Sequence, residues 1–354
     1  MTLEIVWFCL IAVLWSGYFL LEGFDFGVGM LLPFLPRAGS ERQRAVMFES
    51  IGPVWDGNEV WLVVAAGATF AAFPAWYATM FSGFYIALLL ILALLIVRVV
   101  SFEWREKSED PRWRAVWMWM NTIGSVGAAF IWGVALANLL HGVPLTSSHQ
   151  FSGDFLDLFS AYTVLAGLTV VCVFALHGAT YLSLRTDGDL RERAAATARR
   201  LSIPAAVVGA AFLAWTVVVA HQRNERGVVP VAIPAALTAL ALLFAVWFIR
   251  TRHEGRAFAV TGLGAIGIVA TIFTGLYPRV LVSHPTFANS LTTSNAATGQ
   301  YALKVITIVA AIFIPVILLY QGWTYHVFRK RLSGEPVKSP VAAAAARTGR
   351  TTPD

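Results

Sequence analysis

Acidic side chains inside two long apolar segments are the residues best suited to chemistry. Asp25 lies within the first segment, and Asp56, Asn58 and Glu59 lie near the start of the second. An ionisable group in hydrocarbon is costly, so such residues mark functional candidates. Desolvation and proximity of like charges favour the protonated form of at least one carboxyl group. With an amide and small neighbours that leave room for water, this set suits proton uptake.

The depth of the two aspartates can be estimated from helix geometry. Asp25 lies nine residues before Phe34, the expected inner end of its segment, which corresponds to about 14 Å at the helical rise. Asp56 lies several residues past the expected start of the next segment, about 6–12 Å from that end. Because a short loop joins the two segments as antiparallel neighbours, we expect Asp25 and Asp56 to face one another.

Structural roles for these acidic groups stay open. Asp56 and Glu59 fall in the first turns of a helix, where the helix dipole stabilises negative charge. For Glu59 the structural and functional interpretations are balanced. The functional interpretation is favoured for Asp56, and more strongly for Asp25, which lies well inside its segment.

Two further polar residues are candidate partners of the carboxylates. Arg98 ends the third apolar segment, where it either extends its charge toward water or pairs with a buried carboxylate. His177 lies within the fifth apolar segment and is expected to be a polar group linked to water, or an extension of the proton path.

The elements that position these residues are predicted from composition. Of the 354 residues, 58% are apolar and 13% are charged, against about 25% charged in soluble domains. Each long apolar segment can cross a bilayer as a helix, since a crossing takes about 20 residues. The sequence therefore predicts an all-α, polytopic membrane protein with about nine transmembrane helices. We place them at about 5–34, 52–75, 79–100, 117–141, 157–184, 203–221, 228–250, 257–278 and 301–328.

The sequence also predicts the domain limits and contains none of the common metal-binding or catalytic motifs. Residues 1–332 are predicted to form one membrane domain, and 333–354 a disordered cytoplasmic tail. No Walker A, CxxC, HExxH or GxSxG pattern is present, so we expect no metal site and no catalytic residue in this chain.

The distribution of basic residues predicts the orientation. Of the 26 lysines and arginines, 22 lie in alternate loops and the C-terminal tail, and only Arg223, Arg226, Arg279 and Lys304 lie on the other side. The positive-inside rule then places the N-terminus outside and the C-terminus in the cytoplasm. The basic charge is explained by topology, so nucleic acid is not an expected partner.

Two sequence runs closely resemble subunit II of the cytochrome bd quinol oxidases. They are GFDFGVGML at 23–31 and GPVWDGNEVWL at 52–62. The likeness covers nearly the whole chain except the tail. It continues through FAAFP at 70–74, FSGFY at 81–85, EWR at 103–105, WR at 113–114, GATYL at 178–182, YP at 277–278, SLT at 290–292 and YQGW at 320–323.

The resemblance implies an architecture and a partner. It implies two four-helix bundles plus a peripheral ninth helix, docked on a homologous subunit I in a bacterial cell membrane. That partner is expected to hold haem b, haem d and the quinol-oxidising loop, whereas this chain holds no haem. A quinone bound structurally in this subunit, membrane lipids and a small accessory membrane subunit are further expected components.

The resemblance also implies an activity and residue roles. The complex would oxidise quinol and reduce oxygen to water with protons taken from the cytoplasm. Asp25 and Asp56 resemble the carboxylates of that proton path, and Trp61 resembles an aromatic residue lining an apolar oxygen route. His177, which precedes Gly178, departs from the pattern that the family leads us to expect.

Two other functions are alternatives. Buried carboxylates and helices interrupted by Gly and Pro also suit a secondary transporter with coupling-ion sites. Against it, the buried charges lie off-centre, and the other segments have almost no charge at the membrane midplane. A purely structural assembly partner, in which Asp25 and Asp56 only pair with basic groups, is the third hypothesis.

Overall fold

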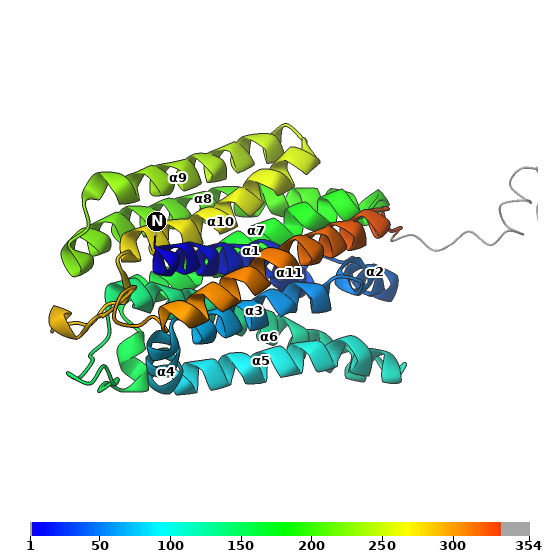
Figure 1. Ribbon diagram of the computed structural model, residues 1–354. Coiled ribbons are helices and arrows are strands. Elements are labelled where there is room, and N and C mark those ends of the chain that lie inside the picture. Colours follow the sequence, from blue (N-terminus) through cyan, green and yellow to red (C-terminus); the bar gives the residue numbers. More distant parts are fainter. Residues whose placement is uncertain (1, 334–354) are drawn as a thin grey trace, which may run out of the picture.

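Long helices form almost all of the structure, a computed structural model that describes residues 2–333 (Figure 1). Of the predicted tail at 333–354, only Ser333 is among the described residues, and the rest of that prediction lies outside them. The long helices are α1 Leu3–Leu31, α3 Trp55–Ala72, α5 Tyr85–Trp104, α6 Pro111–His141, α7 Ala161–Arg185, α8 Gly188–Asn224, α9 Val228–Arg250, α10 Glu254–Leu276 and α11 Gln300–Val327.

Short elements lie between the long helices. Two are α-helices, α2 Glu41–Ile51 and α4 Pro74–Gly83. Strands β1 Arg279–Leu281 and β2 Leu291–Thr292 pair antiparallel in the loop between α10 and α11. Single 3-10 turns are η1 Arg105–Lys107, η2 Phe155–Leu158 and η3 Phe287–Asn289.

The predicted all-α membrane class is confirmed. Within the described residues, eight helices are long and apolar enough to cross a membrane. The second predicted span, α3, has 18 residues, carries Asp56 and Glu59, and is not among those eight. The number of nine crossings therefore stays a prediction, although α3 packs along α1 like the other long helices.

Helix boundaries differ from the apolar segments where local chemistry overrides hydropathy. The chain breaks at Phe73, and Pro74 opens α4, because proline is well suited to the first turn of a new helix. Helix α2 begins after Ser40, whose hydroxyl oxygen accepts a hydrogen bond from the Gln43 N–H. Helix α8 starts at Gly188, fifteen residues before the predicted crossing, because its polar first turns continue outside the apolar segment.

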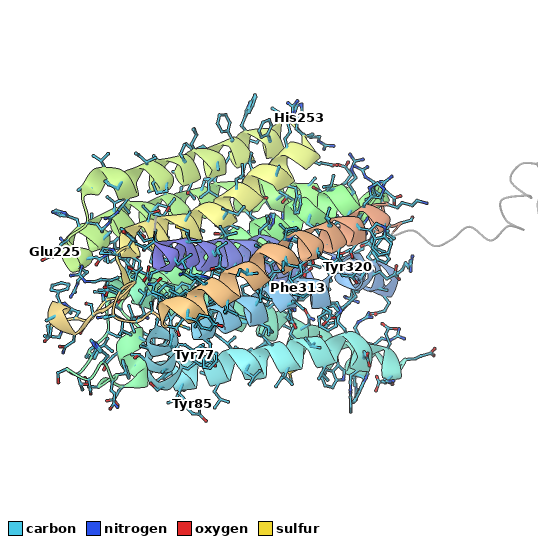
Figure 2. All side chains as sticks on the ribbon, viewed as in Figure 1. Tyr77, Tyr85, Glu225, His253, Phe313 and Tyr320 are labelled. Carbon is cyan, nitrogen blue, oxygen red and sulfur yellow. The ribbon has the colours of Figure 1, made fainter. Side chains whose placement is uncertain are left out.

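The long helices form two groups, which meet along α1 and where α6 packs on α7. Helices α1, α3, α5 and α6 form one group, and α7, α8, α9 and α10 form the other. Helix α11 packs on α3 and α1 at the periphery, where Phe313 and Tyr320 project from it, 56% and 64% exposed (Figure 2). This grouping is compatible with the two bundles and the peripheral helix that the resemblance implies, whose exact topology stays a prediction.

Two glycines let α1 and α7 approach until their backbones touch. A Cβ on Gly27 would lie 1.9 Å from the Phe174 carbonyl oxygen, and one on Gly178 would lie 2.3 Å from the Gly27 carbonyl carbon. No larger residue fits there without separating the helices. The two helix groups are therefore joined next to Asp25 on α1 and His177 on α7.

The first long helix begins, and the last long helix ends, at opposite ends of the molecule. Figure 1 shows the start of α1 at one end, and α2 together with the last turns of α11 at the other. This placement agrees with an odd number of crossings. Which end faces the cytoplasm stays a prediction from the basic residues.

Candidate functional site

Asp25 is held by an amide from the neighbouring helix. Its side chain is fully buried on α1, and its Oδ2 accepts a hydrogen bond of 2.7 Å from Asn58 Nδ2 on α3. Asn58 Oδ1 in turn accepts hydrogen bonds from Tyr325 Oη at 2.7 Å and Gln321 Nε2 at 3.1 Å, both on α11. Asn58 thus joins three helices at the position of Asp25.

Arg98 pairs with carboxylates in the interior. Its side chain on α5 is completely buried, and Nη1 lies 2.8 Å from Glu22 Oε1 and 3.1 Å from Glu59 Oε1. The guanidinium group also lies 4.8 Å from the ring centre of Phe26 and 5.6 Å from that of Phe102. Of the two expectations for Arg98, the structure shows pairing rather than extension toward water.

Asp56 does not lie against Asp25. The side chain of Asp56 is exposed in the first turn of α3, and it forms no hydrogen bond or ion pair with any residue of the described range 2–333. Asn58 follows two residues later, on nearly the opposite face of the helix. The expectation that the two aspartates face one another therefore does not match the structure, because the helical turn brings Asn58 to Asp25 instead.

Acidic groups outnumber basic ones in this site. Glu22, Asp25 and Glu59 surround the single cation of Arg98. Uncompensated buried charge is costly, so the site favours keeping protons on its surplus carboxyl groups. No group of three or more His, Cys, Asp or Glu suited to a metal ion occurs between residues 2 and 333.

Several polar atoms of the site have spare hydrogen-bonding capacity. Glu22 Oε2, Asp25 Oδ1, and Arg98 Nε and Nη2 are buried without a hydrogen-bond partner in the described part of the chain. Buried polar groups without protein partners are places where water binds. Carboxyl groups linked through water can pass protons to one another.

His177 occupies a different site. Its ring is buried and lies parallel to Phe258 at 4.6 Å, with Nδ1 2.8 Å from Thr261 Oγ1 on α10. Its Nε2 lies 3.1 Å from the Leu20 carbonyl oxygen of α1. A carbonyl oxygen only accepts hydrogen bonds, so Nε2 donates its hydrogen there. His177 connects three helices and has no direct bond to the carboxylates around Arg98.

Trp61 fills the space that Gly17 leaves on α1. A Cβ on Gly17 would lie 2.1 Å from the Trp61 ring, so the ring rests directly on the α1 backbone. Beside it, an apolar groove of about 580 Å³ opens between α3, α4 and α5. Trp15 and Trp132 belong to its lining, together with Leu62 and Gly67, but Trp61 does not.

Sequence reasoning missed three members of the site. Glu22 lies three residues before Asp25, and the criterion of charge inside an apolar segment would have selected it. Tyr325 gave no signal, and Gln321 appeared only within the YQGW run that carries the resemblance, because a hydroxyl or amide near a helix end is ordinary. Only the position of α11 reveals that both contact Asn58.

Comparisons with known proteins agree with this architecture. The family model described as cytochrome bd terminal oxidase subunit II matches residues 3–328. The chain is 42% identical to the cytochrome bd ubiquinol oxidase subunit 2 of Bacillus subtilis, covering 94% of this chain and 97% of that protein. Identity to the cytochrome bd-I ubiquinol oxidase subunit 2 of Escherichia coli K12 is 36%, covering 95% and 97%.

A solved structure shows the same fold. The chain matches a chain of the bd oxidase from Geobacillus thermodenitrificans with a TM-score of 0.72 at 19% identity, covering 93% of this chain and all of the other. The family match spans nearly all of the helical region and includes both the Asp25 and the Asn58 segments. This chain belongs to the family of cytochrome bd terminal oxidase subunit II.

Proposed function

We propose that this chain conducts protons from the cytoplasm into a quinol oxidase complex formed with a subunit I. In that complex, oxidation of quinol is coupled to reduction of oxygen to water, which consumes protons. The observation that supports this proposal is the cluster of carboxyl groups around Arg98, in which Glu22 and Asp25 are buried and Glu59 is partly exposed. Such a group can hold and release protons, whereas the surrounding apolar side chains cannot.

The proposed path begins at the exposed end of α3. Asp56 lies at the surface, and Glu59 follows one turn later on the same side of the helix, 22% exposed. Glu59 shares Arg98 with Glu22, and Asp25 follows Glu22 by one turn of α1. Asn58 holds Asp25 in place. Protons would move from Asp56 through Glu59 and Glu22 to Asp25, with water at the unpartnered atoms.

Arg98 and His177 are proposed as positioning residues. Arg98 compensates one negative charge and keeps Glu22 and Glu59 within reach of a common water network. His177 ties α1 to α10 through Leu20 and Thr261, and so fixes the opposite face of the helix that carries Asp25.

The electron-transfer and oxygen chemistry is assigned to the partner. We propose that haem b and haem d lie in subunit I, and that a small accessory membrane subunit and lipids complete the complex in the bacterial cytoplasmic membrane. Oxygen, being small and apolar, would reach the complex through apolar spaces beside Trp61, which packs on Gly17. Because the chain belongs to an oxidase subunit family, we favour the oxidase function over the secondary-transporter alternative.

A structurally bound quinone would need a long apolar recess. We propose the groove of about 580 Å³ between α3, α4 and α5, whose lining is almost entirely apolar. Gly67 lines it, and a side chain added there meets no atom within 4 Å. The substitution Gly67→Trp should therefore fill the groove without disturbing the helices. It should lower the quinone content of the purified complex; unchanged quinone content would exclude this groove.

The proton path is tested by Asp25→Asn in the assembled complex. The amide keeps the size of the side chain but cannot hold an exchangeable carboxyl proton. Oxygen consumption and proton uptake should fall by about a hundredfold, the lower end of the range for positioned proton-transfer groups. The haem absorption spectrum should stay unchanged, which shows that assembly is intact.

A carboxylate outside the path provides the matched control. Glu192 is exposed on α8 and pairs there with Arg252. Glu192→Gln removes one negative charge and should leave both rates unchanged. If Asp25→Asn consumed oxygen and took up protons as fast as the wild type, the proposed path would be wrong.

A further inference from the structure

Basic residues gather at one place on the side of the molecule that otherwise avoids them. Of the four basic residues predicted to lie outside, Arg223 and Arg226 lie where α8 ends, and Arg279 lies just after α10. Asn224 joins these segments, because its Oδ1 accepts a hydrogen bond from Arg279 Nη1 at 2.5 Å. Topology disfavours arginine here, so the gathering calls for a binding partner with negative charge.

The positive field extends to the neighbouring loop. His284 lies in the segment between α10 and α11, outside the spanning helices. Partial burial, and next the charge of Arg223, lower the pKa of His284. Arg279 has an acidic neighbour in Glu225, at 3.9 Å, but Glu225 is 76% exposed and compensates it weakly.

Arg226 is fixed at the end of α8. Glu225 adopts the left-handed conformation with φ 53°, and the Arg226 N–H donates to the Ala220 carbonyl oxygen at 3.1 Å. These are features of a helix C-terminal cap, which sets the backbone of Arg226 before any ligand arrives. Glu225 marks this corner at the end of the bundle (Figure 2).

The side chain of Arg226 has unused capacity. Its guanidinium group lies 5.5 Å from the ring centre of Tyr277, and its Nε is buried without a hydrogen-bond partner among residues 2–333. When a guanidinium group lies over an aromatic face, its N–H donors point outward in the plane of the guanidinium group and can still bind other acceptors. Arginine donors suit the oxygens of a phosphate group.

An apolar groove begins at the same arginine. It measures about 390 Å³ and runs between α1 and α10, where Phe8, Cys9, Ala12 and Phe273 form part of its lining. Arg226 is the only charged residue of that lining in the described chain. On the other side, Arg226 also borders a polar pocket of about 410 Å³ that includes Asn224 and Arg279.

We propose that this groove binds one phospholipid, with an acyl chain between α1 and α10 and the phosphate group against Arg226. A phospholipid combines the two chemistries that meet at this point, an apolar chain and an anionic group. The polar pocket would receive the glycerol headgroup of a lipid such as phosphatidylglycerol. By the predicted orientation, this lipid belongs to the outer leaflet.

The proposal is tested on the assembled complex by native mass spectrometry after transfer from phosphatidylglycerol-containing nanodiscs. The wild type should retain one more phosphatidylglycerol molecule than Arg226→Gln. Loss of a charge-assisted contact should weaken retention roughly tenfold. Cys9→Phe should reduce retention as well, because Cys9 is exposed and its replacement fills the groove.

Two variants serve as matched controls. Lys304→Gln removes a positive charge from an exposed residue of α11 that lines neither the groove nor the polar pocket, and Val13→Phe adds a ring at a 59% exposed position of α1 outside the groove. Both should retain the lipid like the wild type. Equal retention in Arg226→Gln and wild type would overturn the proposal.

A photo-crosslinking measurement distinguishes lipid from protein at this surface. Phosphatidylglycerol with a diazirine in its acyl chain should label peptides of α1 and α10 that contain Cys9 or Thr274. If a bifunctional reagent attached to Cys9 instead joined this chain to subunit I, the groove would be a protein contact and the lipid proposal would fail.

Discussion

Helix α1 has a buried polar site on each of two faces, and the two sites differ in kind. Toward α3 and α5, Glu22 and Asp25 meet Arg98 and Asn58, with more acids than bases and several unpartnered atoms. Toward α7 and α10, the carbonyl oxygen of Leu20 accepts a hydrogen bond from His177. Both ring nitrogens of His177 have hydrogen-bond partners. We call these the carboxylate site and the histidine site.

The comparison shows that burial of a polar group is not enough to indicate function. In the histidine site, Thr261 and Thr180 complete the hydrogen bonds around His177, so the group resembles a structural connection between helices. In the carboxylate site, surplus charge and spare hydrogen-bonding capacity persist in the interior. Those two properties are costly for stability, and the proton conduction proposed above would explain their presence.

Removing the central cation should have the largest effect. Arg98→Leu leaves the buried Glu22 and the partly exposed Glu59 without compensation, which should destabilise the complex by about 3–5 kcal/mol. His177→Leu, which removes the hydrogen bonds of the ring to the Leu20 carbonyl and to Thr261, should cost about 1–3 kcal/mol. Thermal unfolding of the purified complexes compares the two variants. Equal losses would contradict the distinction between the sites.

Separating the helices should disturb both sites together. Gly27→Ala places a Cβ 1.9 Å from the Phe174 carbonyl oxygen, which should cost about 1–3 kcal/mol because the backbone of α7 must move. Gly67→Ala is the matched control, since a Cβ there meets no atom within 4 Å, and its stability should change by less than about 1 kcal/mol. Similar thermal stability of the two variants would show that α1 and α7 can separate freely.

Neutralising the partly exposed carboxylate of Glu59 should affect activity more than stability. Glu59→Gln retains a side chain that can accept from Arg98 but not carry a carboxyl proton. Oxygen consumption should fall about tenfold, less than for Asp25→Asn, because water can bypass a partly exposed group. Asp56→Asn at the fully exposed end of α3 should have a smaller effect. The reverse order would mean that protons enter elsewhere.

The smallest effect is expected in the histidine site. His177→Gln keeps a donor for the Leu20 carbonyl and an acceptor for Thr261, so stability should change by no more than about 1 kcal/mol. Oxygen consumption and its dependence on pH should match the wild type. A displaced pH profile in this variant would place His177 in the proton path and remove the contrast between the two sites.

Local residue types predicted most of the fold. Each predicted apolar segment overlaps one of the nine long helices, because a run of apolar residues is a local property of the chain, although nine membrane crossings stay a prediction. The errors lie at the ends and breaks. Pro74 starts a new helix inside a continuous apolar run, and α2 forms in a loop that hydropathy alone does not describe as helical.

The sequence alone determined the membrane class, the subunit II resemblance and the presence of buried acids, since each depends on residues close together in the chain. Tertiary structure decided which of them meet. Arg98 lies 39 positions from Glu59 along the chain and far from Glu22 and Asp25, yet all converge where α1, α3 and α5 pack. Helical rotation turned Asn58 rather than Asp56 toward Asp25, and the position of α11 added Tyr325. Charge and hydropathy are local properties, whereas proximity depends on how helices rotate and pack against one another.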